Sequence, residues 1–160
     1  MVKTIQRVSI IGTGTIGASW AALFLASGLH VTATDIAPDA EAKLRRYIDL
    51  AWPALKRIGM ADGAGQNKLR FTADIADCVA DADLVQENGP ERLDFKIALY
   101  EQLDRLLPPD VLIASSSSGL TMSAIQVGCN RHPERCVIGH PFNPPHLIPL
   151  VEVVGGALTS

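Results

Sequence analysis

Three glycines near the N-terminus constrain this chain more than any other feature. Gly12, Gly14 and Gly17 follow a short apolar run, Val8 to Ile11, and precede apolar residues at helical spacing. This order predicts a strand, a tight turn and a helix. In such a unit Gly12 permits the turn, Gly14 lets the backbone approach a pyrophosphate, and Gly17 lets the helix pack closely on the strand.

The helix after the glycines would place its N-terminus at the turn. Its first N–H groups have no partner within the helix, and the helix dipole favours a negative charge there, so a phosphate is the expected ligand. Ile16, Trp20, Leu23 and Phe24 are spaced to form one apolar face of this helix. The residues expected to hold the phosphate are Gly12, Gly14, Thr15, Ile16 and Gly17.

A single acid supports the reading of the glycines as a nucleotide site. Gly28 is expected to end the first helix, and Leu29 to Thr34 form a second strand that Asp35 closes. A carboxylate there accepts hydrogen bonds from the adenosine ribose and repels a 2′-phosphate, which favours NAD over NADP. The alternatives are an ordinary glycine turn and a solvated acid at a strand end. The complete strand–turn–helix–strand–acid unit favours the dinucleotide.

The rest of the chain alternates strand and helix patterns. Pro38 is expected in the first turn of a second helix, and Pro53 is expected to kink or split that helix. Further strands are expected at Leu69 to Thr72, Ala82 to Gln86 and Val111 to Ala114, and further helices at Asp74 to Val79 and Leu93 to Leu107. This alternation predicts an α/β fold: one domain, residues 1–160, with a Rossmann-type, doubly wound, mostly parallel sheet and helices on both faces.

Charge and cysteine content exclude several other classes. The net charge is −3 without a run of Lys or Arg, so nucleic acid is not expected as a main ligand. No apolar stretch is long enough to span a bilayer, and no signal peptide is expected, because Met1 to Arg7 leads directly into the first expected strand. The three cysteines, Cys78, Cys129 and Cys136, lack C-x-x-C spacing. We therefore expect no disulfide framework, no metal site and a reducing, cytoplasmic location.

Four serines, Ser115 to Ser118, follow the fifth expected strand. Ligands of doubly wound sheets bind outside the carboxyl ends of the strands, so these hydroxyls are placed to bond a ribose or a substrate. A polar turn whose serines cap the helix near Thr121 explains the same residues equally well. Local sequence leaves both interpretations open.

A histidine and a glutamate near the C-terminus form a candidate acid–base pair. His140 ends the apolar run Cys136 to Gly139, and Glu152 lies inside the apolar run Leu150 to Val154. A carboxylate buried in such a strand needs a partner, and a histidine is the simplest one. Together the two residues are typical of a general base that an acid orients and whose imidazolium it stabilises. His146 lies close enough in sequence to be a substrate contact.

These motifs, taken in order, resemble the L-3-hydroxyacyl-CoA dehydrogenase family, whose NAD-binding domain covers essentially the whole chain. The matching motifs are Gly12 to Gly17, Asp35, Glu87 with Glu91 and Lys96, Ala114 to Ser118, and His140 with Asn143-Pro144 and Leu150 to Glu152. The resemblance implies NAD as the cofactor. It also implies oxidation of a 3-hydroxyl to a 3-keto group by hydride transfer.

The resemblance assigns a role to each matching residue. His140 corresponds to the catalytic base and Glu152 to its partner. Ser118 corresponds to the serine that bonds the substrate 3-oxygen, and Asn143 to a substrate residue. Glu91 and Lys96 correspond to cofactor contacts near the nicotinamide half, and Ser116 to a cofactor residue that is asparagine in many members.

The run from His140 to Leu150 is closer to one branch of the family, which contains L-carnitine dehydrogenase and lambda-crystallin (L-gulonate dehydrogenase). The expected substrate is therefore a 3-hydroxyacyl-CoA, as in the fatty-acid enzymes, or a small 3-hydroxy acid such as L-carnitine or L-gulonate. Family members continue into a C-terminal helical domain, absent from this chain, that closes the cleft and mediates dimerisation. A homodimer is accordingly expected of the full-length protein.

The sequence also admits two alternatives of other kinds. The chain could be an NAD-binding or crystallin-like structural module without turnover, which would have no need of His140, Glu152 and Ser118. It could also belong with the 6-phosphogluconate- or 3-hydroxyisobutyrate-type dehydrogenases, which share the glycine motif but use a catalytic lysine. The pair of His140 and Glu152 disfavours that assignment.

Overall fold

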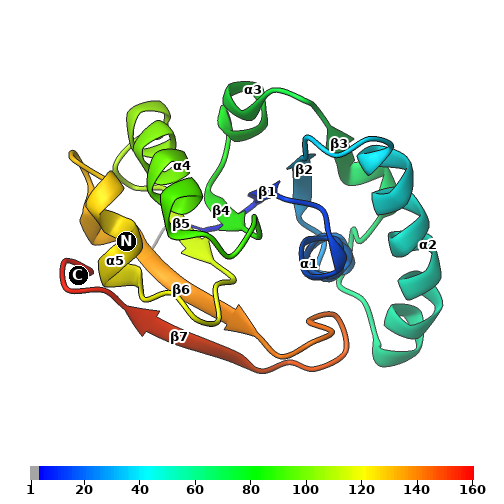
Figure 1. Ribbon diagram of the computed structural model, residues 1–160. Coiled ribbons are helices and arrows are strands. Elements are labelled where there is room, and N and C mark those ends of the chain that lie inside the picture. Colours follow the sequence, from blue (N-terminus) through cyan, green and yellow to red (C-terminus); the bar gives the residue numbers. More distant parts are fainter. Residues whose placement is uncertain (1–3) are drawn as a thin grey trace.

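The computed structural model describes residues 4–160 and contains one seven-stranded sheet (Figure 1). The strands are ordered β3-β2-β1-β4-β5-β6-β7, and all pair in parallel except β7, which is antiparallel to β6. They comprise β1 (Arg7–Ile11), β2 (His30–Thr34), β3 (Leu69–Phe71), β4 (Leu84–Glu87), β5 (Leu112–Ser115), β6 (Cys136–Pro141) and β7 (Val151–Gly155). The expectation for the N-terminal segment includes residues 1–3, which lie outside the described residues.

Helices cover both faces of this sheet. They comprise α1 (Thr15–Ala26), α2 (Ala40–Ile58), α3 (Ile75–Val79), α4 (Leu93–Leu106) and α5 (Met122–Ile125), with short 3₁₀ turns η1 (Gln66–Lys68), η2 (Gln126–Gly128) and η3 (Pro133–Arg135). One core packs α1 and α2 against β1 and β2, and a second packs α3, α4 and α5 against β1, β4, β5 and β6. Figure 1 shows these two layers on either side of the sheet. The predicted doubly wound α/β fold is confirmed.

Helix α1 is buried differently from the sequence expectation. Ile16, Leu23 and Phe24, expected on its apolar face, are only partly buried. Leu25 is fully buried instead, together with a series of small residues that includes Ala21 and Ala22. The cause is that α1 lies between the sheet and α2, so small side chains are needed on two sides of it.

Helix α2 begins after Pro38 and does not split at Pro53, contrary to two of the proline expectations. It begins at Ala40, after Asp39 in a left-handed conformation, so Pro38 lies before its first turn. Pro53 lies inside one continuous helix. Pro53 and Asp49, whose carbonyl loses its N–H partner, are both exposed. Water can therefore replace the missing hydrogen bond without breaking the helix.

Among residues 4–160 no helix combines the length and apolar character needed to cross a bilayer.

Candidate active site

The carboxyl ends of β1, β2, β4, β5 and β6 lie at one edge of the sheet because these strands are parallel. The glycine turn, Asp35, the serines and His140 therefore share this edge. A topological switch point, where consecutive strands leave in opposite directions, lies between β1 and β4. Ligands of this fold class bind there.

Gly12 and Gly17 take the structural parts that their spacing predicts, and the contact of Gly14 with a pyrophosphate stays a prediction. Gly12 has φ of +84°, and a Cβ on it would lie 2.7 Å from the carbonyl oxygen of Asn88. A Cβ on Gly17 would overlap the carbonyl oxygen of Gly12. A Cβ on Gly14 would meet nothing within 4 Å, so the space above this residue is open. The backbone is therefore closely packed at Gly12 and Gly17, whereas the space next to Gly14 is open.

The N-terminus of α1 has no side-chain cap. Gly14 is the N-cap residue and makes no side-chain hydrogen bond, and both it and Thr15 are exposed. No side chain caps the first N–H groups of the helix, which leaves them accessible to an external acceptor. Such an end favours a phosphate through its N–H groups and its dipole.

Asp35 is fixed beside this turn. Its Oδ2 accepts hydrogen bonds from the Thr13 N–H at 2.6 Å and the Thr13 hydroxyl at 3.0 Å, and its Oδ1 accepts one from the Ala37 N–H at 2.8 Å. Partial burial raises the pKa of Asp35, but these hydrogen bonds outweigh it and hold the pKa below its ordinary value. The carboxylate is therefore ionised and preorganised as an acceptor.

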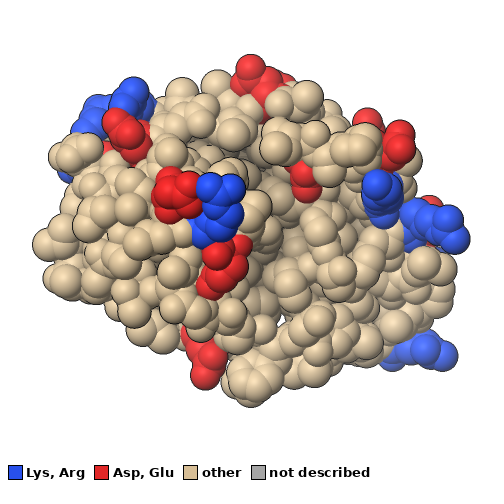
Figure 2. Space-filling model, viewed as in Figure 1, with Lys and Arg blue, Asp and Glu red and all other residues tan. Residues whose placement is uncertain are grey.

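A cavity of about 530 Å³ opens from the glycine turn. Its lining includes Gly12, Gly14, Asp35, Asn88, Phe95 and Leu99. Figure 2 shows the hollow in the middle of this face, where most atoms belong to uncharged residues. An apolar cleft with a few polar groups at this position fits the adenosine half of a dinucleotide, with the diphosphate over Gly14.

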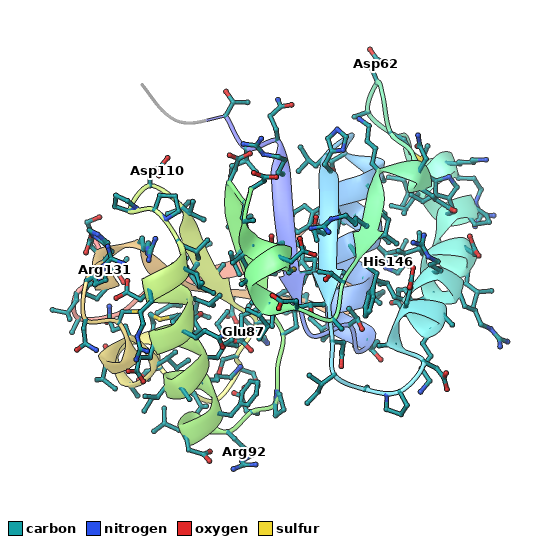
Figure 3. All side chains as sticks on the ribbon, turned by 90° about the horizontal axis from the view of Figure 1, so that it is seen from above. Asp62, Glu87, Arg92, Asp110, Arg131 and His146 are labelled. Atoms are coloured by element: carbon teal, nitrogen blue, oxygen red, sulfur yellow. The ribbon has the colours of Figure 1, made fainter. Side chains whose placement is uncertain are left out.

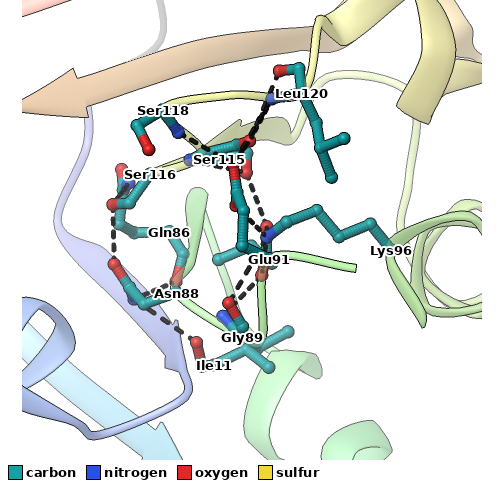
Figure 4. Close-up of polar contacts among 12 residues, drawn as sticks. Ile11, Gln86, Asn88, Gly89, Glu91, Lys96, Ser115, Ser116, Ser118 and Leu120 are labelled. Carbon is teal, nitrogen blue, oxygen red and sulfur yellow. Dashed lines mark hydrogen bonds and ion pairs between the residues drawn. The ribbon is translucent and has the colours of Figure 1, made fainter. Parts of the chain in front are cut away.

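Ser116 takes part in a hydrogen-bond network at the ends of β4 and β5 (Figure 4), and this network extends to α1 through Trp20. Its hydroxyl donates to Oδ1 of Asn88 at 2.7 Å and accepts from Nε2 of Gln86 at 2.8 Å and Nε1 of Trp20 at 3.1 Å. Trp20, on α1, is thereby tied to the end of β5. The hydroxyl of Ser116, expected at the cofactor, is engaged within the protein and supports the wall of the cleft.

Glu91 organises the turn that carries Ser118. One oxygen, Oε1, accepts from the Ser117 hydroxyl at 2.6 Å and from the N–H groups of Ser118 at 3.1 Å, Gly119 at 2.8 Å and Leu120 at 3.3 Å. Burial raises the pKa of Glu91, but these bonds and the charge of Lys96 lower it below its ordinary value. Ser118 is exposed, at the rim of the site.

The serines form a polar turn, in which the hydroxyls of Ser115 and Ser117 accept backbone N–H groups, but the expectation that they cap the helix is wrong. Thr121 caps α5 itself, because its hydroxyl accepts from the Ala124 N–H at 3.3 Å. Ser117 bonds Glu91, and Ser115 donates to Glu87 at 2.6 Å. The role of Ser118 at a substrate stays a prediction.

Lys96 forms a buried ion pair that the sequence interpretation did not anticipate. Its Nζ lies 2.8 Å from both carboxylate oxygens of Glu87, with the two side chains 1% and 0% exposed, and 3.9 Å from Oε2 of Glu91. Figure 3 shows Glu87 at the centre of the molecule. The ammonium group of Lys96 was expected to contact the cofactor, but in the structure it pairs with the carboxylate of Glu87. The sequence signal was a glutamate directly after an expected strand, nine residues before a lysine on the next expected helix.

His140 and Glu152 face each other across β6 and β7. They are register partners, and Nδ1 of His140 lies 3.0 Å from Oε2 of Glu152. A carboxylate partner favours the proton on Nδ1 and leaves Nε2 as the basic nitrogen. The expectation that Glu152 is buried is wrong. Its side chain is 59% exposed, because β7 is an edge strand and all five of its residues are exposed.

The connection between β6 and β7 carries the remaining candidates. Asn143 is exposed, as expected of a substrate residue, though no contact tests that role. His146 is engaged elsewhere: its Nδ1 lies 2.7 Å from the hydroxyl oxygen of Ser19 on α1. Within residues 4–160 no cluster of His, Cys, Asp or Glu has the arrangement of a metal site.

Comparison with known proteins agrees with this geometry. The family described as "3-hydroxyacyl-CoA dehydrogenase, NAD binding domain" matches residues 7–160. L-carnitine dehydrogenases of Streptomyces coelicolor and Pseudomonas aeruginosa are each 52% identical over 99% of this chain and 49% of their own length. The chain therefore spans about half the length of the curated relatives it matches.

Two solved structures extend the comparison. The 5-dehydrogenase of 5-formyl-3-hydroxy-2-methylpyridine 4-carboxylic acid (FHMPC), an NAD+-dependent dismutase, superposes with a TM-score of 0.89 and 40% sequence identity. The match covers 98% of this chain and 51% of the other chain. The 3-hydroxybutyryl-CoA dehydrogenase of Escherichia coli K12 superposes with a TM-score of 0.88 and 33% sequence identity. The match covers 99% of this chain and 34% of the other chain. The chain belongs to the family of 3-hydroxyacyl-CoA dehydrogenase NAD-binding domains, and its cofactor is NAD.

Proposed function

We propose that this chain is the cofactor-binding half of an NAD-dependent dehydrogenase that oxidises a 3-hydroxyl to a 3-keto group with His140 as general base. The observation that carries the proposal is the 3.0 Å contact between His140 Nδ1 and Glu152 Oε2 at the edge of the sheet that also holds the glycine turn. A binding module needs no such pair.

The geometry supports a different catalytic or binding role for each side chain of the site. NAD, when bound, supplies the hydride acceptor. Nε2 of His140 takes the proton of the substrate hydroxyl, and Glu152 holds the ring and stabilises the imidazolium that forms. The Ser118 hydroxyl donates to the substrate oxygen. The carboxylate of Glu91 fixes the turn that carries Ser118, because it accepts hydrogen bonds from the N–H groups of Ser118 and Gly119. Asn143 contributes to substrate binding from the β6–β7 connection.

For the substrate, we propose a small 3-hydroxy acid of the L-carnitine type. Support comes from the relatives named L-carnitine dehydrogenase, about half identical to this chain, against the 33% identity to a 3-hydroxybutyryl-CoA enzyme. Because those relatives are about twice as long, we further propose that the complete protein adds the helical domain expected from the family resemblance and forms a homodimer.

A substrate panel tests the proposal. The complete protein is mixed with NAD and, separately, with L-carnitine, L-gulonate and 3-hydroxybutyryl-CoA, and NADH formation is followed by absorbance. We expect NADH formation with L-carnitine at the highest kcat/KM. NADH formation best with the thioester would overturn the substrate class. NAD binding without turnover of any of the three would favour a structural module instead.

A further inference from the structure

The connection between β6 and β7 crosses the molecule to the helices that flank the cofactor turn. Residues 142–150 extend from the end of β6 to α1 and α2 (Figure 1), and His146 lies beside these helices (Figure 3). The segment is mostly exposed, and of its residues only Pro145 is buried. Its position must therefore depend on a small number of specific contacts.

His146 makes those contacts. Its backbone N–H donates to the hydroxyl oxygen of Ser19 at 3.1 Å, and its Nδ1 lies 2.7 Å from the same oxygen. Its ring meets Tyr47 of α2 edge-on, with centroids 5.9 Å apart. In the part of the chain that the structure describes, every hydrogen bond from residues 142–150 to another helix or strand goes to Ser19. The other backbone bonds of the segment stay within it.

The chemistry of this contact favours one protonation state of His146. The Ser19 oxygen already accepts the N–H of His146, so the hydroxyl is satisfied when it donates its one proton to Nδ1. The ring is then neutral and carries its proton on Nε2. A charged ring would instead donate from Nδ1, so the Ser19 oxygen would accept two hydrogen bonds and its own proton would need a different acceptor. Burial also lowers the pKa of His146, in the same direction.

The two partners belong to the two halves of the site. Ser19 is fully buried in α1, one turn after the helix N-terminus at the glycine turn. His146 lies between His140 and Glu152 in sequence, in the segment of residues 142–150 that also contains Asn143. The contact is therefore a direct link between the helix that receives the diphosphate and the strand pair that carries the proposed base.

We propose that His146 is a positioning residue. Through Ser19 it holds the β6–β7 connection against α1, and so sets Asn143 and the His140–Glu152 pair relative to the bound dinucleotide. The inference rests on the proposed function for its catalytic consequence, but the contact itself can be tested without turnover. His146 acts through Ser19 and does not touch the substrate.

The kinetic test uses four variants of the complete protein: Ser19→Ala, His146→Ala, the double variant, and His146→Asn, whose side-chain oxygen can replace Nδ1 as the acceptor. We expect both single alanine variants to lower kcat about tenfold or more, because displacement of reacting groups by about 1 Å is that costly. The double variant should be no slower than the slower single variant, and His146→Asn should recover most of kcat. The KM for NAD should change little.

Tyr47→Leu is the matched control for stability. It removes the ring contact but leaves both hydrogen bonds to Ser19, so it should lower Tm while kcat stays near that of the parent protein. If His146→Ala leaves kcat unchanged, or if Ser19→Ala is silent while His146→Asn is as slow as His146→Ala, the positioning role is wrong. The second pattern would mean that the imidazole acts on the substrate directly.

A second readout separates this inference from the proposed function. Nitrogen-15 NMR of histidine-labelled protein should find His146 neutral with the proton on Nε2, and Ser19→Ala should shift the Nδ1 resonance, because that atom loses its hydrogen-bond donor. Hydrogen exchange of residues 142–150 should become faster in Ser19→Ala. Both results are expected even if no 3-hydroxy acid is turned over. A ring protonated on Nδ1, or exchange that Ser19→Ala does not change, would overturn the contact.

Discussion

Asp35 combines two functions in one carboxylate, since it anchors the glycine turn and faces the cavity. Its oxygens are held by Thr13 and Ala37, yet the residue lines the cleft. Its position at the end of β2 was predictable, because it depends on strand length and a motif. Its bonds to Thr13 were not, because they require the turn to fold back onto β2.

Replacing Asp35 with Asn should weaken NAD binding about tenfold, because a ribose hydroxyl bonds a charged acceptor more strongly than an amide. The ratio of NADP affinity to NAD affinity should rise, since the repulsion of a 2′-phosphate is lost. Quenching of tryptophan fluorescence measures both values of Kd. Asp62→Asn, in an exposed loop, is the control and should leave them unchanged. An unchanged NADP-to-NAD ratio in Asp35→Asn would contradict the ribose assignment.

The lowered pKa of Asp35 also predicts a pH dependence of stability. Because the folded state lowers this pKa below 3.8, the stabilisation by Asp35 is complete above pH 3.8 and is lost as the pH falls through the folded-state value. The difference in the free energy of unfolding between the parent protein and Asp35→Asn should therefore shrink on acidification. Urea unfolding across this range measures it, and a difference that grows on acidification would refute the assignment.

At the scale of elements, the glycine turn and α1 form one unit whose glycines have different tasks. Strand positions were predictable to within about two residues because apolar runs and Gly or Pro breaks mark them. The buried face of α1 and the continuity of α2 through Pro53 were not. Both depend on what lies beside each helix, and no local pattern carries that information.

Gly17→Ala and Gly14→Ala should separate folding from binding. A Cβ at Gly17 overlaps the Gly12 carbonyl, so this variant should lose about 2 kcal/mol or more of unfolding free energy. A Cβ at Gly14 meets open space, so this variant should keep its Tm but bind NAD more weakly, because the methyl group occupies the expected place of the diphosphate. Calorimetry and NAD titration test both. Full NAD affinity in Gly14→Ala would contradict the placement.

The Glu87–Lys96 pair joins β4 to α4 and should be costly to break. Lys96→Met leaves a buried carboxylate without its cation, which should cost about 3–5 kcal/mol of unfolding free energy. Adding Glu87→Gln should recover part of that loss. Arg45→Met, which breaks the exposed pair with Glu41, is the control and should cost at most about 1 kcal/mol. Similar losses in the two single variants would show that the buried pair contributes no special stability.

On the scale of the whole molecule, the site is assembled where the halves of the sheet meet. Residues near one another in sequence, such as the glycines, were assigned from motifs and spacing. The pairing of His140 with Glu152 was inferred from chemistry. The accompanying prediction that Glu152 is buried was wrong, because Glu152 lies on an edge strand. Links between distant segments, such as Ser116 with Trp20 and His146 with Ser19, were missed because they depend on packing across the sheet.

The most direct test of the central claim is the rate of NADH formation by His140→Gln in the complete protein, saturated with NAD and L-carnitine. Glutamine preserves bulk and polarity but cannot act as a base. We predict that kcat falls about 10²–10⁴-fold while the affinity for NADH, from fluorescence, remains that of the parent protein. A kcat within about twofold of the parent value, with binding intact, would contradict the assignment of His140 as the base.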